Sequence, residues 1–140
     1  MTLLLGVAVL AIDIGRMYVI RADLQSFTDA AALSAAMELN GTEAGLALAR
    51  AGAGRLASGP HAMLWDMGTQ PITNIVTSFS SDNKSWLEQP KQAAGCRFVR
   101  VVATAAAPVI FLRVFHPVTS SQVAAASVAA KTEQTASLLQ

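Results

Sequence analysis

The first 39 residues contain no proline, and this stretch limits what the rest of the chain can fold into. It begins with the apolar segment Met1–Ile12 and ends in the alanine-rich segment Asp29–Ala36. Apart from Gly6 and Gly15, its residues are good or acceptable helix formers, so the stretch predicts one helix. At 1.5 Å per residue this helix is roughly 60 Å long, which is more than a small domain covers. Its first half must therefore lie in a membrane, in a partner or in other copies of the chain.

The composition of the 140 residues argues against several classes of protein. The net charge is only +1 and the basic residues are scattered, so we expect no nucleic-acid partner. The single cysteine, Cys96, excludes an intramolecular disulfide, and no zinc or haem motif surrounds it. The length allows at most one compact domain in addition to the helix.

Candidate catalytic or metal-binding residues are few. His61 and His116 each lie next to a proline, and neither is paired with a serine or cysteine in a motif. Met63 and Met67 lie near His61, but packing within a turn explains this group better than a metal site does. We therefore expect no enzyme activity, no catalytic residue, no cofactor and no bound metal.

Residues 40–140 predict a small α+β head that packs on the second half of the helix. Asn40-Gly41 is a helix stop signal, and Thr42 is the expected N-cap of a second helix over 43–57. Valine-rich or alternating segments predict antiparallel strands at about 72–80, 96–107 and 119–130. The second of these strands is apolar on both faces, so we expect it in the centre of the sheet.

Two stripes of side chains are predicted along the long helix, residues 1–39. Ala8, Ala11 and Gly15 place small side chains near one line, and the spacing of Ala11 and Gly15 permits close helix crossing. The stripe expected to pack on the sheet consists of Leu24, Phe27, Ala31 and Leu33–Met37.

Asp13 is a carboxylate within the otherwise apolar run, and two interpretations are open. In the first, it pairs with Arg16 at i+3 on the helix surface, which stabilises a helix by a few tenths, roughly 0.2–0.5 kcal/mol. In the second, it meets a cation of a neighbouring subunit, either Arg16 or the N-terminal amine, inside an apolar bundle. A buried pair of this kind would fix the register of the subunits.

The N-terminal pattern resembles a known family. The apolar segment runs into Gly6-Val7-Ala8-Val9-Leu10-Ala11-Ile12-Asp13-Ile14-Gly15-Arg16-Met17-Tyr18, and Leu24-Gln25 and Asp29-Ala30-Ala31-Ala32-Leu33 follow. These motifs resemble those of the TadE/TadG-like proteins of tight-adherence (Flp-type) pili. Closing segments similar to those of the family are Phe98–Val101, Phe111–Phe115 and Ala124–Ala130.

The resemblance implies a pilin-like fold and a structural subunit that polymerises through its N-terminal helix into a bacterial surface filament used for adherence. The alternative is a membrane-anchored accessory protein of a pilus or secretion machine, with a periplasmic binding head. The implied partners are other copies of the chain and other Tad-type pilins. The implied location is the inner membrane before assembly and the cell surface afterwards. The residues expected at the assembly contact are Leu4, Ala8, Ala11, Asp13, Gly15, Arg16 and Tyr18.

The uncharged segment Met1–Ile12 is shorter than the ~20 residues that span a bilayer. We therefore expect that Met1 is a processed terminus or that further residues precede it. Related processed pilins carry glutamate at the fifth mature position, where this chain has Leu5.

Overall fold

The computed structural model describes residues 2–58, 72–108 and 120–132. It contains two helices and three strands in the order α1 (Thr2–Glu38), α2 (Glu43–Ser58), β1 (Ile72–Ser80), β2 (Phe98–Pro108) and β3 (Ser120–Ala130). The strands form one antiparallel sheet in the order β1-β2-β3. The predicted α+β class is confirmed, and β2 is the central strand as expected. Three features lie outside the described residues: the group around His61, the residue His116 and the segment Phe111–Phe115.

Helix α1 ends where the sequence predicts, and a short turn leads into α2. Gly41 adopts a φ of +77°, a conformation that favours glycine after a helix end. The Thr42 side-chain oxygen accepts a hydrogen bond from the backbone N–H of Gly45 at 3.1 Å, which is the contact of an N-cap. The Asn40 side chain accepts a hydrogen bond from the Thr42 N–H at 3.0 Å and fixes the turn. Helix α2 extends one residue beyond the predicted 43–57.

Two glycines of α2 provide a matched test of this turn. A Cβ atom added at Gly45 would lie 2.1 Å from the Asn40 side-chain oxygen and 2.9 Å from the Glu38 carbonyl oxygen, whereas one at Gly54 meets nothing within 4 Å. We expect Gly45→Ala to lower the free energy of unfolding by ~1–3 kcal/mol through overpacking. Gly54→Ala should raise it by ~0.5–1 kcal/mol, because alanine is the better helix former. Urea denaturation measures both, and equal effects would contradict the close contact at Gly45.

The strands differ from their predicted bounds only at their ends and at one irregularity. Strand β2 begins at Phe98 rather than at residue 96, because Cys96 belongs to a turn in which its N–H bonds the Ala93 carbonyl at 3.2 Å and Gly95 has a φ of +92°. Burial raises the pKa of the Cys96 thiol, and the negative charge of Glu43 adds to this shift. In β1 the register against β2 shifts between Thr73 and Ile75, which marks a β-bulge.

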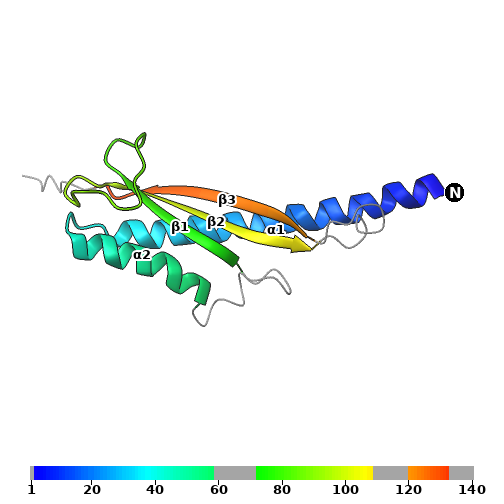
Figure 1. Cartoon of the computed structure of the whole chain (residues 1–140), viewed down its shortest axis with the longest axis horizontal. Helices are drawn as coiled ribbons and strands as arrows, with labels where there is room; N and C mark the ends of the chain where they lie inside the picture. Colours follow the sequence, from blue (N-terminus) through cyan, green and yellow to red (C-terminus); the bar gives the residue numbers. More distant parts are fainter. Residues whose placement is uncertain (1, 59–71, 109–119, 133–140) are drawn as a thin grey trace, which may run out of the picture.

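The sheet covers the second half of α1, and α2 lies beside α1 (Figure 1). On α1 the core side chains include Leu24, Phe27 and Ala31, all fully buried. Every second residue of β2 is buried, and all the buried ones are small: Val99, Val101, Ala103, Ala105 and Ala107. The first half of α1 extends beyond the strands (Figure 1).

The predicted packing of Leu33–Met37 on the sheet is wrong for its two largest members. Leu33 is 61% exposed and Met37 is 72% exposed, whereas Ala35 and Ala36 between them are buried. Successive residues of a helix are separated by about 100°, so Leu33 and Met37 share one side and cannot both face the sheet together with Leu24 and Ala31. The inward side of the last turns is therefore lined by alanine alone.

Candidate assembly surface

The first half of α1 carries a surface of exposed apolar side chains. Val7 is 61% exposed and Tyr18 is 72% exposed, although both are large and apolar or mostly apolar. Other large apolar side chains exposed in this half are Leu10, Ile12, Ile14 and Val19. Monomeric soluble proteins rarely expose a contiguous apolar patch of more than a few hundred Å². A patch of this kind marks a contact with a partner or with lipid.

Small residues lie among these large side chains. Ala8, Ala11, Gly15 and Tyr18 follow one another at spacings of three and four residues, so they occupy one side of the helix. All four are exposed, and a Cβ atom at Gly15 would meet nothing within 4 Å. The structure thus brings four of the predicted site residues onto one open side, where a second helix can approach closely. The side chain of Leu4, a fifth predicted residue, lies outside the part that the structure describes.

Asp13 lies on the other side of the helix. It is 3% exposed in the single chain, and it does have an interaction partner. Its position is seven residues before the buried Ile20 and eleven before the buried Leu24, which is the spacing of one helix side. Arg16 is half-buried. The contact of Asp13 with a cation of a neighbouring subunit stays a prediction.

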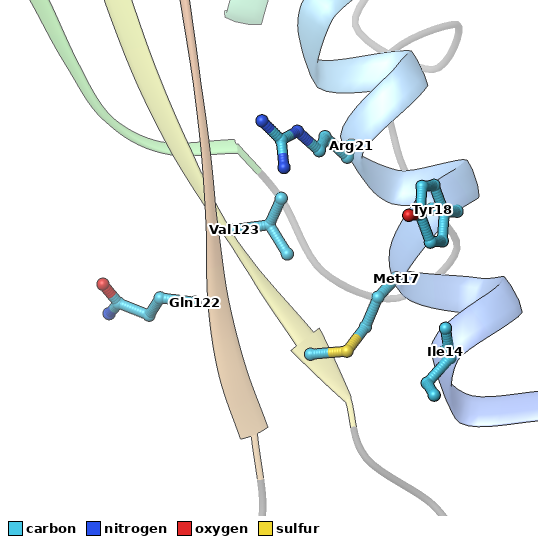
Figure 2. Close-up of a pocket in the computed structure, with 6 residues that line it drawn as sticks. All are labelled: Ile14, Met17, Tyr18, Arg21, Gln122 and Val123. Carbon is cyan, nitrogen blue, oxygen red and sulfur yellow. The ribbon is translucent and has the colours of Figure 1, made fainter. Parts of the chain in front are cut away.

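A groove continues the exposed surface from α1 onto the edge strand β3. It has a volume of about 330 Å³ and is lined by Ile14, Met17, Tyr18, Arg21, Gln122 and Val123. Figure 2 shows Met17 and Val123 pointing into the space between the helix and the strand, and the Arg21 side chain extending toward β3. The sequence did not predict this groove, because it forms only where β3 lies against α1. Its mainly apolar lining suits an apolar side chain of a partner better than a chemical reaction.

A polar cluster holds β3 in register against α1. Gln25 donates a hydrogen bond from Nε2 to the Ser127 Oγ at 2.8 Å, and Ser127 Oγ donates to the Asp29 carboxylate at 2.5 Å. The hydroxyl groups of Thr28 and Ser127 are 2.7 Å apart. Thr28 and Ser127 are buried, and buried polar groups need such partners. Gln25 and Asp29, which stand out as sequence motif residues, therefore serve to position the sheet on the helix.

Two further properties concern the part of the chain that the structure describes. Within residues 2–58, 72–108 and 120–132, no helix has both the length and the apolar content needed to cross a membrane. In the same ranges, no group of three or more His, Cys, Asp or Glu side chains is placed to hold a metal ion.

Comparison with known proteins finds a family match at the N-terminus. No curated protein and no solved structure matches the chain. The family model Tad, described as "Putative Flp pilus-assembly TadE/G-like", matches residues 1–38. This range includes all of α1 and confirms the resemblance carried by Gly6–Tyr18 and Asp29–Leu33. A pilus-assembly family is structural in character, so the match indicates contact with other pilus components and a surface or membrane-associated location. Through its first 38 residues the chain is thus similar to the TadE/G-like Flp pilus-assembly proteins, and this match indicates a role in pilus assembly.

Proposed function

We propose that the chain is a structural, pilin-like subunit that polymerises through α1 into a bacterial surface filament used for adherence. The observation that supports this most is the exposed apolar side of the first half of α1, from Val7 to Val19. Burial of apolar surface is the dominant favourable contribution to most protein–protein association, so several exposed side chains of this size favour assembly. The family match at residues 1–38 falls on the same segment.

The mechanism that we propose is assembly rather than catalysis. Before assembly, the apolar side of α1 lies in the inner membrane, where lipid covers it. In the filament, the same side is covered by other copies of the chain and by other Tad-type pilins. Ala8, Ala11 and Gly15 have small side chains or none, so a second helix can pack against this side at short distance. The head, which consists of α2 and the sheet, then lies on the outside of the filament, where it is available for adherence.

A charge placed on the exposed side of α1 tests this proposal. Ala11→Arg should reduce the filaments recovered by shearing at least ~10-fold, because a contact between subunits would bury the new charge without a partner, and 1.4 kcal/mol is enough for a tenfold change. Ala11 is exposed in the single chain, so the free energy of unfolding should change by no more than ~0.5 kcal/mol.

The matched control is Ala47→Arg, the same substitution at an exposed position of α2. It should leave the number of filaments unchanged. Normal filaments from the Ala11→Arg variant would contradict assembly through this side of α1. Retention of the wild-type chain in the membrane, with no filament in any preparation, would instead favour the anchored accessory protein.

A further inference from the structure

Two stretches of the head match the acceptor pattern for N-linked glycosylation, in which an asparagine is followed two positions later by serine or threonine. They are Asn40-Gly41-Thr42 and Asn83-Lys84-Ser85, and in both the middle residue is not proline. Both asparagines are exposed. Because the pattern is short, the surroundings of each asparagine decide whether its amide is available for modification.

Asn83 lies at the tip of an exposed turn. All residues from Ser81 to Ser85 are exposed, and Asn83 has a φ of +59°. This left-handed conformation is one in which asparagine is enriched among the residues other than glycine. In Figure 1, the segment that follows β1 lies at the end of the head remote from the N-terminus. A group attached there would not obstruct the first half of α1.

The side chain that holds this turn together is Asp82. Its Oδ1 accepts hydrogen bonds from the backbone N–H groups of Lys84 and Ser85, both at 2.9 Å, and from the Ser80 hydroxyl at 2.8 Å. The Ser85 hydroxyl makes only a long contact of 3.3 Å with Asp82 Oδ2. None of these bonds involves the side chain of Asn83. Its amide can therefore react without loss of the bonds that hold the turn.

The Asn40 side chain has the opposite role in its own turn. Its Oδ1 accepts hydrogen bonds from the Thr42 N–H at 3.0 Å and from the Thr42 hydroxyl at 2.6 Å. The Thr42 hydroxyl oxygen in turn accepts the N–H of Gly45 at 3.1 Å as the N-cap of α2. The amide and the hydroxyl of this stretch are thus both used to join the two helices.

We propose that Asn83 is an N-glycosylation site of the head and that Asn40 is not modified in the folded chain. The donor is a sugar activated as a glycosyl diphosphate, on a nucleotide or on a lipid carrier. The bond from C1 of the sugar to the diphosphate oxygen breaks, and a bond from C1 to Asn83 Nδ2 forms. One amide proton passes to a base of the transferase, and the diphosphate leaves with its carrier.

The difference between the two asparagines follows from what the transferase has to contact. An amide nitrogen is a weak nucleophile because its lone pair is delocalised into the carbonyl, so the enzyme must hold the whole amide group. Because the pattern requires a hydroxyl two positions later, the enzyme must contact that group as well. At Asn83 this costs one long contact of Ser85. At Asn40 it breaks both bonds to Thr42 and the N-cap of α2.

Peptide mass spectrometry of the protein sheared from the cells that carry it tests the site. We expect added sugar mass on the peptide that contains Asn83 and none on the peptide that contains Asn40. One hexose would identify a nucleotide-linked donor, and several sugars would identify a lipid-linked glycan. Asn83→Gln and Ser85→Ala should each remove the added mass, whereas the matched control Asn40→Gln should leave it unchanged. An unmodified Asn83, or sugar on Asn40, would overturn the proposal.

A second measurement uses a purified soluble N-glycosyltransferase with UDP-glucose as the donor. In the folded chain, Asn83 should react at least ~10-fold faster than Asn40, because reaction at Asn40 requires the loss of several hydrogen bonds. Synthetic peptides covering residues 36–46 and 79–89 lack these folds and should react at similar rates. Equal rates in the folded chain would contradict the distinction. The proposed polymerisation is tested separately, since Asn83→Gln should leave the number of filaments unchanged.

Discussion

Phe27→Ala is expected to lower the free energy of unfolding by about 3–5 kcal/mol, the usual cost of removing a buried aromatic side chain. Phe27 is fully buried and is the largest side chain that α1 contributes to the core. The same core cluster includes Ala31 on α1 and Ala103 on β2, and alanine side chains cannot move to fill a void. Because small domains have a total stability of only ~5–15 kcal/mol, this loss should be visible as a large shift of the urea midpoint.

Leu33→Ala is the matched control on the same helix. Leu33 is largely exposed, so its truncation should change the free energy of unfolding by no more than ~0.5 kcal/mol. Both variants should carry Ala11→Arg, so that association between subunits does not add to the measured stability. A similar loss in the two variants would mean that the second half of α1 is buried on both sides, contrary to the exposure of Leu33 and Met37.

The fold was predictable because its main signals are local. A proline-free run with Asn40-Gly41 at its end determines α1, and the side chain of Thr42 determines where α2 begins. The alternation of buried and half-buried residues in β2 follows from a run of valine and alanine that is suitable for both faces of a central strand. Each of these signals acts within a few residues along the chain, so a sequence pattern is sufficient to locate it.

The direction in which α1 presents its side chains was harder to predict. Apolar residues are distributed almost evenly around α1, so no side stands out as the buried one. Which side is buried depends on where the sheet and α2 pack, and this is decided by contacts between residues that are far apart in sequence. For this reason the outward direction of Leu33 and Met37 was missed. The groove beside Val123 depends on the same kind of distant contact, because β3 forms one of its walls.

Removal of residues 1–11 is expected to convert a self-associating chain into a folded monomer. In the part of the chain that the structure describes, the hydrophobic core begins at Ile20, and Met17 packs against it. Among the side chains of this segment that the structure describes, Val7 and Leu10 are exposed and none belongs to the core. The free energy of unfolding of the truncated chain should equal that of the Ala11→Arg variant to within ~0.5 kcal/mol, because surface changes outside a core have small effects.

Light scattering in buffer without detergent provides the measurement. The full chain and its Ala47→Arg variant should form large, polydisperse assemblies, whereas the truncated chain should have the mass of one subunit. The contrast follows from the location of the apolar surface. Water does not cover the exposed apolar side of the first half of α1 favourably, and the head of the same chain leaves side chains such as Val7 and Tyr18 exposed, so other copies are left to cover them in a detergent-free solution. A full chain that is monodisperse and monomeric under these conditions would show that its exposed side is stable in water. The filament proposal would then be wrong.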